Sequence, residues 1–249
     1  MTQRNRLYFA SDFHLGIPNH SESLIREKKI VRWLDYIKTD AEKIFLLGDV
    51  FDFWFEYKKV IPKGFVRLQG KIAELVDAGI EIYLFKGNHD MWMFHYFQEE
   101  LGIKLICHEL EFEYHGKQFY LHHGDGLGQG DYGYKFIKKI FRNPLCIWLF
   151  GILPPRWGLG LAHYFSSKSR LANAANDEIF DQNSEWLLHY CNEMVTQKHF
   201  DYLIFGHRHL PLDLALNNGG HYINLGEWLH HFTYADFDGN NLELKTFEN

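Results

Sequence analysis

The chain has 249 residues, 46% of them hydrophobic and 17% aromatic, which fits one large globular domain or a domain with a cap. Its net charge of −6 and the lack of a long basic run argue against a nucleic-acid-binding protein. The three cysteines have no C-x-x-C spacing, so we interpret them as reduced thiols of a cytoplasmic protein. No stretch approaches the roughly 20 apolar residues that cross a bilayer, and the N-terminal sequence lacks a signal-peptide pattern.

The first part of the chain alternates short apolar runs with segments of helical periodicity. Strands are expected at 7–10, 44–47 and 80–85, with helices at 21–38 and 65–76 between them. This alternation predicts right-handed crossovers and a mostly parallel sheet. Polar motifs follow each of these strands, at the sheet edge where open α/β proteins collect their ligands.

The rest of the chain contains shorter strands on both sides of a helical segment. These strands are expected at 105–106, 112–114, 119–121, 202–205, 212–216, 222–225, 232–237 and 242–246. The pattern predicts an α/β fold in which two mixed sheets pack together with helices outside. We expect residues 1–130 and 199–249 to form the core, and residues 131–198 to form a helical lid inserted into it.

Five short motifs carry most of the candidate chemistry. They are Asp12-Phe13-His14, Gly48-Asp49-Val50-Phe51-Asp52, Gly87-Asn88-His89-Asp90, His122-His123-Gly124-Asp125 and Gly206-His207-Arg208-His209. Each is weak alone, but together they supply carboxylate, amide and imidazole ligands in the number that two divalent cations need. The sequence therefore predicts a two-metal hydrolase that acts on a phosphoester or a pyrophosphate.

The spacing of these residues suggests how the ligands divide between two cations. We assign Asp12, His14, Asp49 and His209 to the first metal, and Asp49, Asn88, His123 and His207 to the second. Asp49 would bridge the two cations, which could then hold a hydroxide at neutral pH. Mixed nitrogen and oxygen ligands suit manganese, iron or zinc better than calcium.

Other polar residues in the motifs have candidate roles around the metals. His89 is a candidate to stabilise or protonate the leaving oxygen, with Asp52 or Asp90 orienting its ring, and the alternative is a supporting contact only. His122 is expected to pack away from His123, because neighbouring strand residues point to opposite faces. Asp125 is a candidate for orienting a ligand.

In their order and spacing, these motifs resemble the calcineurin-like metallophosphoesterase superfamily, and the resemblance runs from Asp12 to His209. The resemblance implies a four-layer αββα sandwich of two mixed sheets. It also implies the dinuclear metal site, with manganese as the favoured ion.

An apolar and aromatic stretch lies between the fourth and fifth motifs. Residues 145–153 are almost entirely apolar, and proline residues bound the run at 144 and 154–155. The basic residues around it are Lys135, Lys138, Lys139, Arg142, Arg156, Lys168 and Arg170. The run fits a buried core helix, a dimer contact, or a lid that takes acyl chains and touches a bilayer; the basic rim favours an interfacial role.

Within the superfamily, this insertion resembles the lid of UDP-2,3-diacylglucosamine pyrophosphatases of lipid A synthesis. The similar segments are 131–134 and 166–169. The resemblance implies a lipid-nucleotide substrate, hydrolysed to UMP and 2,3-diacylglucosamine 1-phosphate, and a peripheral place on the cytoplasmic face of the inner membrane. It implies substrate contacts at Asn88, Asp131, Tyr134, Lys168, Asn176 and His207.

The chain departs from that narrower family at one position. The family commonly has arginine after the motif asparagine, where this chain has His89, and so it lacks a bidentate phosphate clamp. Arg170 and Arg208 are the candidates to supply the missing charge. Two alternatives stay open: a soluble phosphodiesterase or phosphatase acting on a small phosphoester, and a non-catalytic scaffold that binds a partner through the aromatic lid.

Overall fold

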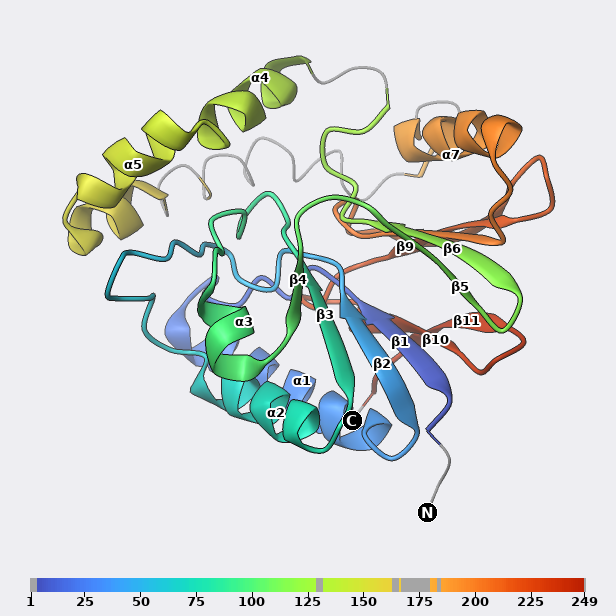
Figure 1. Cartoon of the computed structure of the whole chain (residues 1–249), viewed down its shortest axis with the longest axis horizontal. Helices are drawn as coiled ribbons and strands as arrows, with labels where there is room; N and C mark the ends of the chain where they lie inside the picture. The colour runs from blue at the N-terminus through green and yellow to red at the C-terminus, as the bar shows by residue number, and fades with distance from the viewer. Residues whose placement is uncertain (1–3, 129–131, 163–165, 167–179, 183–184, 249) are drawn as a thin grey trace.

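A computed structural model describes residues 4–128, 132–162, 166, 180–182 and 185–248. Two β-sheets pack face to face, with helices on their outer faces and two further helices beyond one end of the sandwich (Figure 1). The expected α/β sandwich of two mixed sheets is therefore confirmed.

The larger sheet has six strands in the order β11-β10-β1-β2-β3-β4. Its strands are β1 (Arg6–Ala10), β2 (Ala41–Leu46), β3 (Glu81–Phe85), β4 (Lys104–Ile106), β10 (Thr233–Phe237) and β11 (Leu242–Thr246). Strands β1 to β4 are parallel, whereas β10 pairs antiparallel with both β1 and β11. The helices on its outer face are α1 (His20–Ile37), α2 (Val66–Asp77) and α3 (Tyr96–Leu101).

The smaller sheet has five strands in the order β5-β6-β7-β9-β8. Its strands are β5 (Leu110–Tyr114), β6 (Lys117–His122), β7 (Tyr202–Phe205), β8 (Pro211–Ala215) and β9 (His221–Leu225). Helix α7 (Trp186–Gln197) covers its outer face with the buried side chains Leu187, Leu188 and Cys191. Because β6, β7 and β9 are parallel, their carboxyl ends meet at one edge of this sheet.

Aromatic side chains fill the space between the two sheets. Phe9 on β1 stacks on Phe45 at 5.0 Å and lies 6.1 Å from Phe119 on the facing sheet, measured between ring centroids. A second cluster joins the larger sheet to its helices and contains fully buried Trp33 and Trp228. Two cores on the faces of the larger sheet and a third beneath α7 give the four layers αββα.

Three features of the fold were not specified by the sequence analysis. The strand expected at 105–106 is β4, the parallel edge strand of the larger sheet, and does not join the short strands that follow it. The last two strands return to the larger sheet, where β10 pairs with β1. The six-residue helix α3 has no counterpart among the expected elements, because it is too short to show a full helical period.

The described part of the lid consists of α4 (Tyr132–Phe141), α5 (Pro144–Ile152) and a helical segment at 155–162. Phe150 anchors α5 to the core, with its ring centroid 4.8 Å from that of Phe55 and 4.7 Å from that of Trp92. The indole Nε1 of Trp92 donates to the carbonyl oxygen of Phe141 at 2.9 Å. These contacts rest the lid on the loops that follow β2 and β3.

The opposite side of the lid faces solvent. Eleven of the sixteen large hydrophobic side chains that the described chain exposes lie between residues 132 and 161, and α5 buries none of its residues. The interpretation of 145–153 as a buried core helix is therefore wrong. None of the described helices combines the length and the apolar character needed to cross a membrane.

Helix α7 falls within the range 131–198 that the sequence assigned to the lid. Its apolar face packs against Tyr120 and Phe205 of the smaller sheet, so it serves as the outer layer of the core. We therefore propose that the insertion ends near residue 185, where α7 begins.

Candidate metal centre

The loops that follow the strands have an unusual backbone. Positive φ angles, which non-glycine residues rarely adopt, occur at Asp12 (56°), His14 (44°), Asp49 (51°), His207 (67°) and His209 (59°). All five residues belong to the sequence motifs, and their loops lie at the carboxyl ends of β1, β2 and β7. Such strain typically concentrates at functional sites, where the surrounding structure holds it in place.

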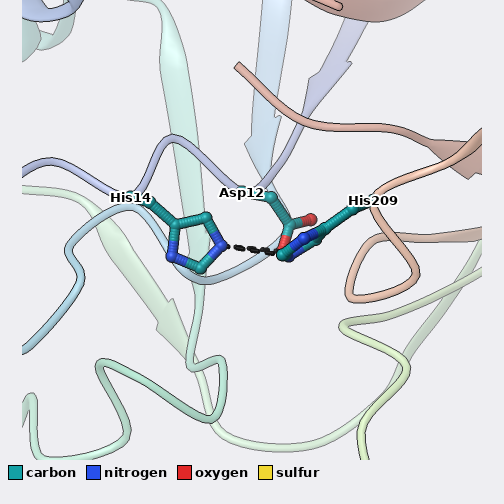
Figure 2. Close-up of side chains that lie close together, drawn as sticks. All are labelled: Asp12, His14 and His209. Carbon is teal, nitrogen blue, oxygen red and sulfur yellow. Dashed lines mark hydrogen bonds and ion pairs between the residues drawn. The ribbon is translucent and has the colours of Figure 1, made fainter. Parts of the chain in front are cut away.

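The first group of converging side chains is Asp12, His14 and His209 (Figure 2). His209 Nε2 lies 3.1 Å from His14 Nε2 and 3.3 Å from Asp12 Oδ1. Asp12 Oδ1 is buried and accepts no hydrogen bond from the described residues. An ionised oxygen in that state needs a compensating cation, and one carboxylate with two imidazoles is a donor set that fits a divalent metal.

The second group is Asp49, Asn88, His123 and His207. Asn88 Oδ1 lies 3.0 Å from His123 Nε2 and 2.8 Å from His207 Nδ1. Asp49 Oδ2 lies 3.4 Å from His123 Nε2 and, on its other side, 3.9 Å from His14 Nε2. Asp49 therefore stands between the two groups, as a bridging ligand must.

The electrostatics of the site also suit a cation. Burial alone would raise the pKa of the Asp49 carboxyl, but His123 and His89 hold it well below its usual range. Burial opposes a charge on His123, yet the Asp49 carboxylate outweighs this and raises the pKa of His123 to about 10. Burial lowers the pKa of His14, and it lowers that of His207 to about 4. The site thus combines ionised carboxylates with neutral His14 and His207, and a bound cation would replace the proton that His123 otherwise carries.

A backbone contact fixes the orientation of His123. Its Nδ1 donates to the carbonyl oxygen of Leu47 at 2.7 Å, which leaves Nε2 directed at Asn88 and Asp49. A second hydrogen bond of this kind is the usual way in which a ligating imidazole is held in one orientation.

Asp90 holds two of the motif loops together. Its buried carboxylate accepts from Gly87 N and Val50 N, both at 2.8 Å, and from Asp49 N and Phe51 N, both at 3.3 Å. Burial and the neighbouring Asp49 carboxylate raise the pKa of Asp90 to about 7. The expectation that Asp90 could orient the His89 ring is not met, because its contacts go to the backbone.

His89 lies beside the first group, with its ring centroid 4.9 Å from that of His14. Its Nδ1 is 3.0 Å from the backbone carbonyl oxygen of Asp52 and 3.7 Å from that residue's Oδ1. Ser166 of the lid donates from Oγ to Asp52 Oδ2 at 3.0 Å. His89 also joins His14 and Asp49 in a third group of close donor atoms, which the sequence did not predict. With Nδ1 directed at Asp52, Nε2 is the ring nitrogen that points away from this contact.

The other histidine and aspartate of the fourth motif have structural contacts. His122 is buried, its Nδ1 accepts from Gly124 N at 2.8 Å, and burial lowers its pKa to about 3, so its expected packing role is confirmed. Asp125 accepts from the hydroxyl of Tyr134 at 2.6 Å and pairs with Lys138 Nζ at 2.5 Å. These contacts connect α4 to the loop that carries His123. Lys138 is therefore not part of the basic rim that the sequence predicted.

Several residues predicted for the substrate lie near the centre or outside the described part. The Tyr134 ring centroid is 6.2 Å from that of His207, at the edge of the second group. Arg208 is buried and pairs with Glu185 at 3.1 Å, which argues against its expected role as a phosphate clamp. Residues that fall outside the described part of the chain are Asp131, Lys168, Arg170 and Asn176.

A two-sheet αββα sandwich with carboxylate, amide and imidazole groups at its strand ends defines a metal-dependent phosphoesterase. The sequence pattern of the calcineurin-like phosphoesterases matches residues 6–211. The chain belongs to this family, as its motifs indicate.

Individual members of the family show a more specific similarity. The chain is 39% identical to a UDP-2,3-diacylglucosamine hydrolase of Porphyromonas gingivalis, over 98% of each chain. It is 28% identical to a hydrolase of the same name from Serratia proteamaculans, over 88% of this chain and 90% of the relative. Among solved structures, Yfce, a phosphoesterase from E. coli, has a TM-score of 0.47 and 16% identity over 97% of this chain and 93% of that one.

Proposed function

We propose that the chain hydrolyses the pyrophosphate of UDP-2,3-diacylglucosamine to UMP and 2,3-diacylglucosamine 1-phosphate. The observation that carries this proposal is the 39% identity to the P. gingivalis hydrolase over 98% of both chains. The complete set of converging donor groups supports it, since a scaffold without activity has no need of them. The exposed apolar lid favours it over a phosphoesterase that acts on small soluble substrates.

Two divalent cations complete the proposed centre. Asp12, His14, Asp49 and His209 would hold one, and Asp49, Asn88, His123 and His207 the other. Bound cations of this kind activate water and neutralise the charge that develops at phosphorus. Manganese is the favoured ion, and iron or zinc would suit the same donors.

His89 is the proposed acid for the leaving group. Water attacks the α-phosphorus, the bond from that phosphorus to the bridging oxygen breaks, and His89 gives its Nε2 proton to the departing oxygen. The Nδ1 contact with Asp52 fixes the ring in this orientation. Hydrolysis in ¹⁸O-water tests the direction of attack: the label should appear in UMP, and label in the sugar phosphate would refute it.

The lid is the proposed site for the acyl chains and for contact with the membrane. A cavity of about 230 Å³ lies where Leu159 of the lid meets the core. Its lining is mixed: apolar Leu15, Phe53 and Phe65 stand beside polar His20, Glu27 and Lys63. On the outer side, α4 and α5 expose apolar side chains. The exposed basic residues of the lid are Lys139, Arg142 and Arg156. Such a surface fits a peripheral protein on an anionic cytoplasmic leaflet.

Trp148 provides a test of the lid, because 61% of its surface is exposed and its loss should not disturb the core. We expect Trp148→Ser to raise KM for the diacylated substrate about tenfold, the value of one large apolar contact, and to weaken binding to anionic vesicles. Turnover of bis-p-nitrophenyl phosphate should not change. Val66→Ser, which removes a 72% exposed apolar side chain of α2, is the matched control. An equal loss on both substrates would assign the lid a structural role only.

Metal removal should affect both activity and stability. Buried Asp12 and Asp49 repel each other when no cation lies between them, so treatment with EDTA should abolish turnover and lower Tm by about 5 °C or more. Mn²⁺ should restore both properties, whereas Ca²⁺ should restore little, because imidazole is a poor calcium ligand. Full activity of the EDTA-treated protein would contradict the proposed centre.

A further inference from the structure

A buried ion pair involves Arg208, the residue between the two candidate ligands His207 and His209. Arg208 Nε and Glu185 Oε2 are 3.1 Å apart, and their side chains are 8% and 1% exposed. The hydroxyl of Tyr222 on β9 donates to the other oxygen of Glu185 at 3.2 Å. Burying such a pair costs desolvation free energy, which suggests that this position has a role beyond stability.

The pair connects two functional parts of the chain. Arg208 stands between His207 and His209, one imidazole from each group of the centre. Glu185 is the residue at the start of α7, where the chain comes back from the lid insertion. The Arg208–Glu185 contact therefore connects the segment that follows the lid to the loop that carries His207 and His209.

The loop needs such an anchor, because its backbone is strained. Arg208 N donates to Gly206 O at 2.8 Å, which closes a three-residue turn around His207 with a φ of 67°. Turns of this hand are rare and strained, and His209 has a positive φ as well. Asn224 Nδ2 holds Gly206 O at 2.6 Å before the turn, and Arg208 supplies the anchor within it.

We propose that Arg208, held by Glu185, is a positioning residue that fixes the directions of His207 and His209. In this role it would act through the loop backbone and not by contact with the reacting atoms. The inference rests on the proposed metal centre. In this inference the buried pair keeps His209 in place for one cation and His207 in place for the other. It also connects these two ligands to the segment that follows the lid.

The test is calorimetric titration of Mn²⁺ into the full-length protein after EDTA treatment. We expect Arg208→Met to weaken Mn²⁺ binding at least tenfold and to lower kcat on bis-p-nitrophenyl phosphate with little change in KM. It should also lower Tm by about 10 °C, because Glu185 is left as a lone buried charge. Arg208→Lys should recover only part of the Mn²⁺ affinity, since an ammonium cannot match the planar contact.

A double variant separates positioning from simple charge balance. Arg208→Met with Glu185→Leu removes both charges, so Tm should recover while Mn²⁺ affinity stays low. Recovery of both would overturn the inference, as would wild-type Mn²⁺ affinity in Arg208→Met alone. Arg6→Met, which breaks an ion pair with Asp236 at the far end of β1, should lower Tm without weakening Mn²⁺ binding. Failure of the wild-type protein to bind Mn²⁺ would instead remove the metal centre itself, and the inference with it.

Discussion

Asp49→Ala should lower turnover by at least about 10³-fold and reduce the bound Mn²⁺ below two ions per chain. The reason is its position: Asp49 Oδ2 faces His14 on one side and His123 on the other, so its loss affects both groups at once. Its Oδ1 also accepts from His89 N at 2.8 Å, so the backbone of the proposed acid loses its anchor as well. Steady-state kinetics with metal analysis of the purified protein provide the measurement.

A matched substitution controls for the loss of a carboxylate. Asp35→Ala removes an aspartate that is 42% exposed and pairs with Lys38 and Lys71 on the surface of α1 and α2. Surface pairs of this kind contribute less than about 1 kcal/mol, so activity and metal content should not change. Full turnover by folded Asp49→Ala would contradict the bridging assignment.

Gly87→Ala should be nearly as damaging, although it adds only one methyl group. A Cβ at Gly87 would lie 2.1 Å from Asp49 Oδ1 and 2.5 Å from Asp49 N, much closer than atoms can approach. The backbone at Gly87 does not have a positive φ, so the clash alone accounts for the effect. We expect kcat to fall about 10²- to 10³-fold and the free energy of unfolding to fall by about 1–3 kcal/mol.

The control for this change is another glycine in a different setting. Gly70 lies inside α2, and a Cβ there meets nothing within 4 Å. Gly70→Ala should leave activity intact and stabilise the protein by about 0.5–1 kcal/mol, because alanine is the better helix former. Wild-type kcat in Gly87→Ala would mean that the exact position of Asp49 matters little.

The strand-exit motifs were predictable because each follows an apolar run of the right length. Asp12, Asp49 and Asn88 lie at the carboxyl ends of neighbouring parallel strands, and such ends always meet at one sheet edge. The role of Asp90 was not predictable. An aspartate in this motif has the same sequence signature whether it orients a side chain or accepts from a loop 40 residues away.

In the lid, amino-acid composition does not predict which side chains are buried. The run at 145–153 has the composition of a buried helix, and only its contacts reveal that Phe150 faces the core while Trp148 faces solvent. The charge pattern of a sequence likewise does not show which basic side chains are free to bind an anion. Lys138 and Arg208 both looked available for an anion, but they pair with the buried carboxylates of Asp125 and Glu185.

The central claim is that this centre cleaves a lipid nucleotide. The most direct test is UMP release by the Mn²⁺-loaded protein from UDP-2,3-diacylglucosamine, measured beside UDP-N-acetylglucosamine and bis-p-nitrophenyl phosphate. We expect kcat/KM for the diacylated substrate to exceed the other two by at least about 10²-fold, from the apolar contacts of its acyl chains. Activity confined to the chromogenic diester would contradict the lipid substrate and leave only a general phosphodiesterase.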